Sequence, residues 1–444
     1  MNYYLAIDIG ASSGRHIIGY VENGELKTEE LYRFPNGMDK VDGHLVWDTD
    51  RLFSEIKEGI KRSFARCGTI KSLSIDTWGV DYVLFHGDKE VKPAYAYRDV
   101  RMDAVIDKVH EIIPHSELYK RTGIEFQKFN TVYQLYADKV AGRLEGATDF
   151  LMLPEYFMYR LTGVKKKEFC EGTTTSLVNV DSLELDSYVF EKLGYPTEMI
   201  KPLSYPGTLV GRLTPELERE LGGNTDVVFV PTHDTASAVD AIDMSENSPY
   251  ISSGTWSLLG VRTEKAITDE GSRVAGYSNE GGVGYNRYQK NITGMWLVQS
   301  LRSELCPETS YSDIVKMAEA STYTEIFDVN SPKFSAPESM AAAISEDLVG
   351  RGFKAPETAG DFFNSAYVSL ANGYKRAIAD MEKNTGKTYN CIYIVGGGAK
   401  NAYLNALTEK ITGKKVIALP IEATAIGNLK TQMKRCGEGF SAIK

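Results

Sequence analysis

The chain has 444 residues, of which 42% are hydrophobic and 25% are charged, values typical of a soluble protein with two or three domains. Its 50 basic and 60 acidic side chains give a net charge of −10, which argues against non-specific binding to nucleic acid or anionic membranes. The chain lacks a long apolar run and a signal-peptide pattern at its start. Its five scattered cysteines form no C-x-x-C pair, so we expect a reduced, cytoplasmic location.

The first 90 residues alternate strand-like and helix-like stretches. Segments 3–8 and 16–21 are rich in Ile, Tyr and Leu and flank a turn, which predicts a β-hairpin. Apolar residues at helical spacing predict a helix over 50–66. Two short strands are expected at 73–77 and 81–85.

The remaining pattern suggests a second unit. Residues 103–163 are expected to be mostly helical, and 172–210, which contain three prolines, to be irregular. A polar stretch at 245–249 is a plausible domain boundary. After it we expect a strand, turn and strand over 250–260, helices over 295–304 and 362–383, a buried strand over 391–395 and a helix from 401.

Two Gly/Ser/Thr-rich turns predict anion-binding loops. The run Asp8-Ile9-Gly10-Ala11-Ser12-Ser13-Gly14-Arg15 offers backbone N–H groups at two glycines, two hydroxyls and a fixed positive charge. Asp8 precedes the turn and is placed to hold a divalent ion through water. The turn at 252–260 is similar, which suggests an old duplication. The alternative is an ordinary tight hairpin, in which these residue types are common.

Asp234 follows the apolar segment 228–230 and precedes a run of small residues suited to starting a helix. A carboxylate at such a turn stays ionised beside the helix N-terminus and can accept a proton from a substrate hydroxyl. The alternative is a helix cap, a common role for Asp. The neighbouring His233 and Thr235, together with the two anion-binding turns, favour catalysis.

Three further segments each allow two interpretations. The run Asp76-Thr77-Trp78-Gly79-Val80-Asp81 suits a sugar, which needs polar partners and an aromatic face, or a tight connection around a core tryptophan. Tyr97-Arg98-Asp99 can supply a buried charge pair that lines the same cleft, or form a surface ion pair. Gly396-Gly397-Gly398 allows the backbone to approach a ligand closely, or tight packing of a strand against a helix.

Other functional motifs fail on their context. The match to G-x-S-x-G at residues 10–14 is followed by a strand, whereas a nucleophile elbow requires a helix there. Gly386-Lys387-Thr388 lacks the earlier glycine of a phosphate-binding P-loop, because Met381 occupies that place. These features argue against a serine hydrolase and a P-loop enzyme.

Taken together, these segments resemble the FGGY carbohydrate kinases over nearly the whole chain. The strings Asp76-Thr77-Trp78-Gly79-Val80-Asp81 and His233-Asp234-Thr235-Ala236-Ser237 resemble the branch of that family that acts on L-rhamnulose. The other matching segments are residues 8–15, 96–99, 252–258 and 395–398.

The resemblance implies an α/β fold with two actin-like (ribonuclease H-like) domains and a catalytic cleft between them. It implies ATP- and Mg²⁺-dependent phosphorylation of L-rhamnulose on its C1 hydroxyl, giving L-rhamnulose 1-phosphate, in L-rhamnose catabolism. Asp234 is the expected general base, and Asp8 helps to place the magnesium. The expected sugar contacts are Gly79, His233, Asp234, Thr235 and Asn291. The expected ATP contacts are Ala11, Ser12, Ser13, Gly14, Arg15, Thr255, Gln299 and Gly397.

We expect an N-terminal domain over residues 1–244, with the sugar site, and a C-terminal domain over 245–444, with the adenosine site. The expected partners are a small sugar and ATP, with no nucleic acid and no membrane, and the oligomeric state stays open between monomer and homodimer. One alternative is an FGGY kinase for L-fuculose, xylulose or glycerol. Another is a nucleotide-switched binding protein on an actin or chaperone scaffold, which needs no sugar-lined cleft.

Overall fold

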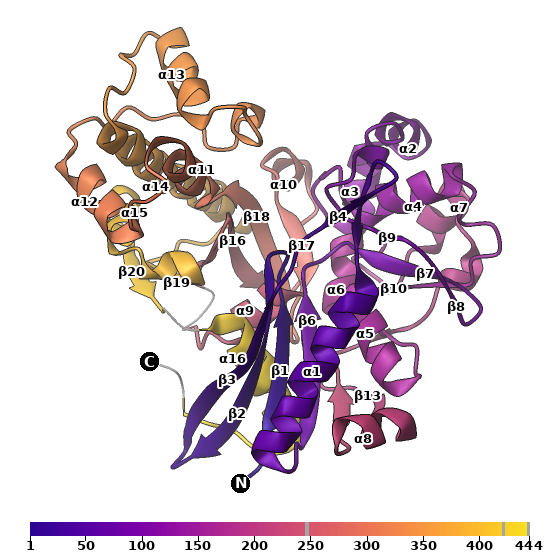
Figure 1. The fold of residues 1–444 in the computed structure, drawn as a ribbon. Helices are drawn as coiled ribbons and strands as arrows, with labels where there is room; N and C mark the ends of the chain where they lie inside the picture. Colours follow the sequence, from indigo (N-terminus) through magenta and orange to yellow (C-terminus); the bar gives the residue numbers. More distant parts are fainter. Residues whose placement is uncertain (245–247, 420–421, 442–444) are drawn as a thin grey trace.

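Each half of the chain contains a six-stranded sheet (Figure 1). The computed structural model describes residues 1–244, 248–419 and 422–441. The N-terminal sheet has the order β13-β14-β6-β1-β2-β3, and its strands are β1 (Tyr4–Ile9), β2 (Ser13–Glu22), β3 (Glu25–Pro35), β6 (Ser72–Thr77), β13 (Leu209–Arg212) and β14 (Asp226–Val228). The C-terminal sheet has the order β17-β18-β16-β15-β19-β20, and its strands are β15 (Tyr250–Ser253), β16 (Trp256–Thr263), β17 (Ser278–Gly281), β18 (Asn286–Thr293), β19 (Cys391–Val395) and β20 (Lys415–Ala418).

Five strands of each sheet follow one plan, whereas the sixth lies at opposite ends, β13 next to β14 and β17 next to β18. In each, a Gly/Ser/Thr turn joins two antiparallel strands, β1 with β2 and β15 with β16. A further antiparallel strand extends one side, β3 or β18, and two parallel strands extend the other, β6 with β14 or β19 with β20. This equivalence supports the duplication suggested by the two turns, and it confirms the predicted α/β architecture of two sheet-containing units.

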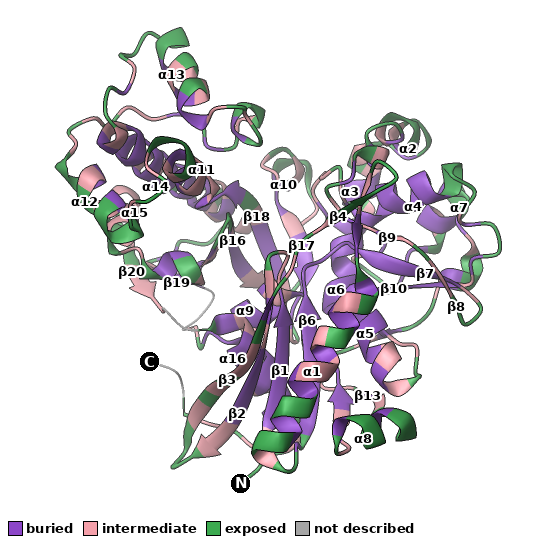
Figure 2. Cartoon of the chain, in the orientation of Figure 1, coloured by how far each residue is buried: buried purple, intermediate pink, exposed green. Residues whose placement is uncertain are grey.

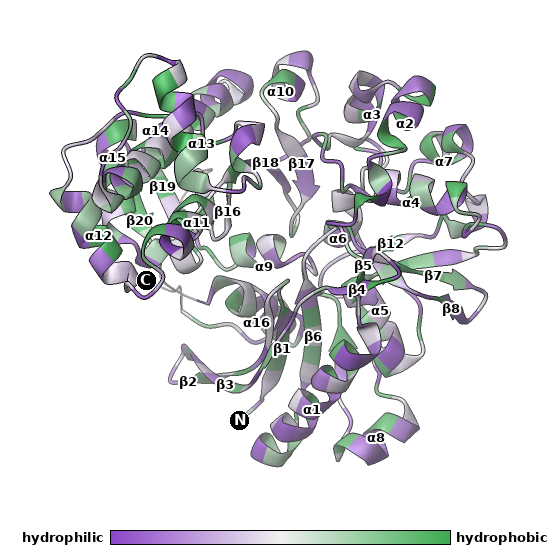
Figure 3. Ribbon diagram, turned by 45° about the horizontal axis from the view of Figure 1, so that its top comes forward, coloured by the Kyte–Doolittle hydropathy of each residue, from purple (hydrophilic) through white to green (hydrophobic). Residues whose placement is uncertain are grey.

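Helices cover both sheets, and the inner strands β1 and β6 are fully buried, whereas the edge strand β3 is largely exposed or half-buried (Figure 2). Hydrophobic residues gather on β1 and β6, whereas the outer helix α1 carries many hydrophilic ones (Figure 3). The helices of the N-terminal half are α1 (Thr49–Cys67), α2 (Ile106–Ile112), α3 (His115–Thr122), α4 (Thr131–Val140), α5 (Leu153–Thr162), α6 (Phe169–Gly172), α7 (Ser187–Leu193), α8 (Pro215–Leu221) and α9 (Asp234–Asp240). Those that follow are α10 (Glu270–Val274), α11 (Trp296–Leu305), α12 (Tyr311–Ala320), α13 (Met340–Gly350), α14 (Ala359–Thr385), α15 (Ala402–Thr412) and α16 (Ala423–Arg435).

Most elements expected from local patterns are present. Helix α1 buries the predicted apolar stripe, and the Asp48 side chain caps it by accepting from Arg51 N. Helices α11, α14 and α15 and strands β15, β16 and β19 lie within a few residues of their predicted positions. Residues 172–210 are less irregular than predicted, because Asp186 caps the short helix α7. The predicted boundary at 244/245 falls on residues 245–247, which lie outside the described residues.

The two strands expected around Trp78-Gly79 belong to different sheets. Strand β6 lies in the large N-terminal sheet, whereas β7 (Tyr82–His86) pairs with β10 (Asp149–Met152) and β8 (Lys89–Val91). Val80, between them, has a left-handed backbone with φ of 72°, which is uncommon for a β-branched residue. Two small sheets complete the fold: β4 (Asp39–Val41), β5 (His44–Trp47) and β9 (Ala94–Tyr95), and β11 (Lys167–Glu168) with β12 (Leu203–Ser204).

Helix α16 follows the C-terminal sheet in sequence but packs on the N-terminal sheet. Leu429 and Met433 lie in one buried cluster with Tyr4 and Ala6 of β1. The amide of Gln432 donates to the backbone oxygen of Leu5 at 3.0 Å. The two halves of the chain are therefore joined by a shared core as well as by the connecting chain. Within the described residues, no helix combines the length and apolarity that a membrane crossing requires.

Candidate active site

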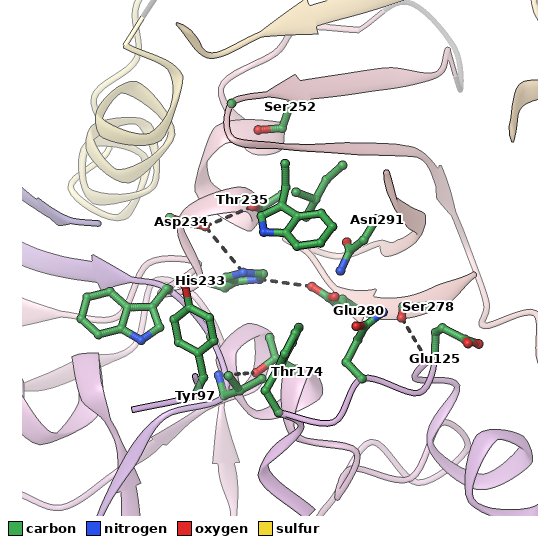
Figure 4. A pocket seen from close by; sticks show the side chains of 18 of the residues that line it. Tyr97, Glu125, Thr174, His233, Asp234, Thr235, Ser252, Ser278, Glu280 and Asn291 are labelled. Atoms are coloured by element: carbon green, nitrogen blue, oxygen red, sulfur yellow. Dashed lines mark hydrogen bonds and ion pairs between the residues drawn. The ribbon is translucent and has the colours of Figure 1, made fainter. Parts of the chain in front are cut away.

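A cavity of about 370 Å³ lies between the two halves and is lined by residues of both. Figure 4 shows side chains that meet in it from opposite sides. Five of the predicted sugar- or ATP-contacting residues and the predicted base line this cavity: Gly79, His233, Asp234, Thr235, Asn291 and Gly397. The N-terminal half also contributes Trp78, Val80, Tyr97, Glu125 and Thr174, and the C-terminal half Ser252, Ser253, Gly254, Trp256, Ser278 and Glu280.

Asp234 is the first residue of helix α9. His233, not Asp234, occupies the N-cap position, and no side chain caps this helix. The Asp234 carboxylate instead accepts a hydrogen bond from Thr235 Oγ1 at 3.0 Å, and its side chain is 34% exposed. The capping interpretation therefore does not apply, and this carboxylate is free to meet a ligand in the cavity.

His233 lies between two carboxylates. Its Nε2 is 3.5 Å from Asp234 Oδ1, and its Nδ1 is 3.1 Å from Glu280 Oε2. Burial alone would raise the pKa of Glu280, but the adjacent Arg287 charge and the hydrogen bond from His233 lower it to about 2. Glu280 therefore remains ionised at neutral pH.

The wall around Gly79 is tightly packed. A Cβ atom at Gly79 would lie 3.0 Å from the Thr174 side chain, so little more than a hydrogen fits. Val80 N donates to Thr174 Oγ1 at 3.2 Å, and Val80 O accepts from Thr131 Oγ1 at 2.7 Å. These bonds hold the strained Val80 backbone in place, as at many binding sites.

Part of the segment 76–81 lines the cavity, and part of it belongs to the core. Asp81 is buried and accepts hydrogen bonds from the indole nitrogens of Trp47 at 2.7 Å and Trp78 at 2.9 Å, so it organises the core. Trp78 borders the cavity but is only 8% exposed. Trp256, which sequence reasoning did not single out as an aromatic contact, is 45% exposed and lines the cavity from the other side.

In the segment 97–99, Tyr97 is a lining residue of the cavity, whereas Arg98 and Asp99 are not. Asp99 is buried and accepts from the backbone nitrogens of Leu45 at 2.7 Å and Arg101 at 2.9 Å. Arg98 packs its guanidinium over the Tyr97 ring, 5.5 Å from the centroid. Neither Arg98 nor Asp99 forms the buried charge pair that one interpretation required.

The N-terminal phosphate turn, with Ala11, Ser12, Ser13 and Gly14 at its tip, does not line this cavity. It is closed by a hydrogen bond from Gly10 N to Ser13 O at 2.9 Å. Arg15 donates to Asp8 at 2.7 and 2.9 Å and pairs with Glu422, so its charge is engaged within the protein. A phosphate that binds Arg15 would compete with these carboxylates.

The C-terminal phosphate turn lies closer to the cavity. Thr255 sits at its tip, between the lining residues Gly254 and Trp256, and its carbonyl accepts from Gly294 N at 3.1 Å. Gln299, on α11, lines a separate cavity of about 460 Å³ together with Trp296, Ser300 and Glu304. The predicted ATP contacts are thus spread over the N-terminal turn, the central cavity and this second cavity.

The three glycines at 396–398 have different roles. A Cβ atom at Gly398 would lie 2.0 Å from Ser253 Oγ, and Gly396 has a left-handed backbone with φ of 84°. These two serve packing and chain direction. Gly396 and Gly397 both line the cavity, but of the three glycines Gly397 alone has no atom within 4 Å of its added Cβ, so its backbone has open space for a ligand beside it.

Asp8, the predicted magnesium residue, is aligned with Asp76 on the neighbouring parallel strand. Burial raises the pKa of both carboxyls, and Asp76 Oδ1 is buried without a hydrogen-bond partner. No set of three or more His, Cys, Asp or Glu side chains forms a metal site within the described ranges. Mg²⁺ keeps much of its water and needs only one or two carboxylates, so Asp8, near the end of β1, fits a hydrated ion, whereas Asp76 is fully buried.

Comparison with known proteins identifies the family. Residues 3–239 match the model of the N-terminal domain of the FGGY family of carbohydrate kinases, and residues 249–436 match that of the C-terminal domain. A rhamnulokinase from Oceanobacillus iheyensis is 42% identical over 433 residues, which cover 97% of this chain and 92% of the relative. The Bacillus subtilis rhamnulokinase is 38% identical and covers 97% of this chain and 90% of the relative.

Solved structures share the fold at low sequence identity. A xylulose kinase from Lactobacillus acidophilus superimposes with a TM-score of 0.80 at 14% identity. The match covers 98% of this chain and 90% of the xylulose kinase chain. A gluconate kinase from the same organism gives a TM-score of 0.82 at 15% identity, covering 98% and 89%. The predicted two-domain sugar-kinase fold is confirmed, and the chain belongs to the FGGY family of carbohydrate kinases.

Proposed function

We propose that this carbohydrate kinase transfers the γ-phosphoryl group of ATP to the C1 hydroxyl of L-rhamnulose and produces L-rhamnulose 1-phosphate, in L-rhamnose catabolism. The observation that carries the proposal is the Asp234 carboxylate, which is unused as a helix cap and opens into a cavity lined by both halves. The near-full-length similarity to proteins named rhamnulokinase supports the choice of sugar.

In this proposal Asp234 is the general base. It orients the C1 hydroxyl toward the phosphoryl group and accepts its proton as the new O–P bond forms. Gly79, His233, Thr235 and Asn291 are the proposed sugar contacts. The tightly packed wall at Gly79 and the polar side chains opposite it suit a compact ligand with several hydroxyl groups.

The proposed nucleotide contacts are the Ala11–Arg15 turn, with Ser12, Ser13 and Gly14, for the phosphates, and Thr255, Gln299 and Gly397 on the other side. Backbone N–H groups at such turns offset charge on a transferring phosphoryl group. Asp8 is the proposed magnesium residue, and the ion would neutralise phosphate oxygens when bound. We place the enzyme in the cytoplasm, where ATP is its cosubstrate.

We further propose domains over residues 1–244 and 245–444 that close over the sugar. The cavity draws its lining from both sides, so closure would bury the reacting groups and exclude water. Exclusion of water suppresses ATP hydrolysis, because a water molecule would otherwise take the position of the sugar hydroxyl.

The test is a coupled assay of ADP formation with L-rhamnulose, L-fuculose, xylulose and glycerol. We expect kcat/KM to be highest for L-rhamnulose and ADP release to depend on the sugar. A higher kcat/KM for another sugar would assign the chain to that substrate. ATP turnover that ignores every sugar would support a nucleotide-switched protein instead.

A further inference from the structure

A charged network connects the two halves directly behind Asp234. Glu280 on β17 contacts His233, which precedes α9, and Arg287 on β18 donates to the same Glu280 oxygen at 2.8 Å. Figure 4 shows the His233 ring between Asp234 and Glu280, with a dashed line to each. The network therefore joins a side chain of the C-terminal half to the proposed base through one imidazole.

Arg287 is held firmly enough to fix Glu280. Its side chain is fully buried, its Nε donates to Gly281 O at 2.9 Å, and its Nη1 donates to Gln289 Oε1 at 3.1 Å. A buried guanidinium needs a carboxylate partner, because an uncompensated charge in the interior is costly. Glu280 therefore remains an ionised acceptor at one position and one orientation.

The Glu280 carboxylate favours the tautomer of His233 that carries its proton on Nδ1. An ionised carboxylate 3.1 Å from Nδ1 accepts the proton on that nitrogen. Arg287 Nη2 also lies 3.2 Å from Nδ1, but its shorter contact is with Glu280. With its proton on Nδ1, the neutral ring presents the lone pair of Nε2 to Asp234 Oδ1, 3.5 Å away.

We infer that Glu280 is a positioning residue for the phosphoryl transfer proposed above: it orients His233 so that Nε2 can take the proton that Asp234 removes from the sugar. This inference rests on the proposed function. The sugar O–H bond breaks as the new O–P bond forms and the bond from phosphorus to the ADP oxygen breaks. The proton moves to Asp234 and then to His233 Nε2, where the imidazolium lies between two carboxylates. Its release to solvent restores the ionised base.

The network also makes the action of the base Asp234 depend on contact between the two halves. His233 belongs to the N-terminal half, and Glu280 and Arg287 belong to the C-terminal half. If the halves separate, His233 loses the acceptor on Nδ1 and Asp234 loses an oriented proton acceptor. Proton removal is then most effective when the cleft is closed, which disfavours transfer to water.

A double-mutant cycle tests whether Glu280 acts through His233. The variants are Glu280→Gln, His233→Asn and the double variant, with Glu264→Gln on the exposed surface as a matched control. We expect Glu280→Gln to lower kcat at least about 10-fold, with both KM values changed less than about 3-fold, and to cause no further loss in the His233→Asn background. Unchanged kcat in Glu280→Gln, or losses that multiply in the double variant, would overturn the inference.

A second measurement uses the folded wild-type protein and no substrate. Histidine ring ¹⁵N NMR reports the tautomer, and the His233→Asn variant identifies the resonances of His233. We expect the neutral ring to carry its proton on Nδ1; a proton on Nε2 would refute the inference even if Glu280→Gln fails to fold. If the wild type does not phosphorylate L-rhamnulose, the proposed substrate fails, and the cycle is then measured with whichever sugar is turned over.

Discussion

Asn428 on α16 donates a hydrogen bond from Nδ2 to Asp76 Oδ2 on β6 at 2.5 Å. The two residues are 352 positions apart in sequence and both are fully buried. Burial and the nearby Asp8 raise the pKa of Asp76, and the bond from Asn428 opposes that rise. This contact links the last described helix to the carboxylate that lies beside Asp8, the proposed magnesium residue.

Replacing Asn428 should therefore destabilise the protein. Asn428→Ala leaves a buried carboxyl oxygen unsatisfied, and we expect the free energy of unfolding to fall by about 1–3 kcal/mol. Urea denaturation at pH 7 measures this. Lys434→Ala, on the exposed side of the same helix, is the control and should change stability by less than about 0.5 kcal/mol. Equal stability of the two variants would show that the bond contributes nothing.

Asp234→Asn should separate catalysis from binding. The amide keeps the shape of the side chain but accepts protons poorly, so we expect kcat to fall at least about 10²-fold. ATP affinity, measured by calorimetry, and the melting temperature should stay close to those of the wild type. Glu216→Gln, on the exposed surface of α8, provides the control. Near-normal turnover in Asp234→Asn would remove this residue from the proposed mechanism.

Gly397 and Gly398 offer a matched pair. Gly397→Ala places a methyl group in open space within the cavity, so we expect unchanged stability but an ATP KM raised at least about 5-fold, equivalent to about 1 kcal/mol. Gly398→Ala drives a methyl group into Ser253 and should cost about 1–3 kcal/mol of folding stability. Thermal melts and steady-state kinetics distinguish the two. The opposite pattern would place the nucleotide elsewhere.

Trp78 and Trp256 should respond differently to alanine. Trp78 is buried and packs on Trp47 with ring centroids 4.2 Å apart, so Trp78→Ala should cost about 3–5 kcal/mol of stability. Trp256→Ala should fold normally and raise the sugar KM about 3-fold or more, because the exposed ring is available to the sugar's C–H face. An unchanged sugar KM would exclude Trp256 from the binding site.

Glu125 predicts a pH dependence of stability. Burial raises its pKa to about 7, against the opposing charges of Arg273 and Lys290. The unfolded chain loses this proton near the ordinary value of 4.5, so between about pH 4.5 and 7 the folded state binds the extra proton. The free energy of unfolding should therefore contain a contribution that falls as pH rises through this window.

Glu125→Gln removes that contribution. We expect its stability relative to the wild type to increase between pH 5 and pH 8, as measured by urea denaturation at several pH values. Glu111→Gln, on the exposed surface, serves as the control and should follow the wild-type curve. A constant difference between Glu125→Gln and the wild type across this range would contradict the raised pKa.

Much of the fold could be predicted from local sequence patterns. The hairpin of β1 and β2, the amphipathic helix α1 and the strand-to-helix turn at Asp234 depend on neighbouring residues, which the sequence displays directly. The relation between the two turns became clear only from the full order of strands, because that order depends on pairing between distant segments.

Contacts between the halves could not be predicted in this way. Glu280 lies in the run Ser278-Asn279-Glu280-Gly281, which has no distinctive spacing. Arg287 meets His233 across 54 positions, and nothing local marks that pairing. The exposure of Trp78 and Trp256 could not be predicted for the same reason. Each tryptophan lies between small residues in the sequence, and only the tertiary structure determines that the Trp78 ring is buried and the Trp256 ring is exposed.

The packing of α16 has a consequence for how the protein is made. Tyr4 and Ala6 of β1 need Leu429 and Met433 to cover one face of the first sheet. A ribosome releases those residues long after it releases β1. Until then that face stays open to water and to chaperones, so the first sheet reaches its native packing only after α16 has been synthesised.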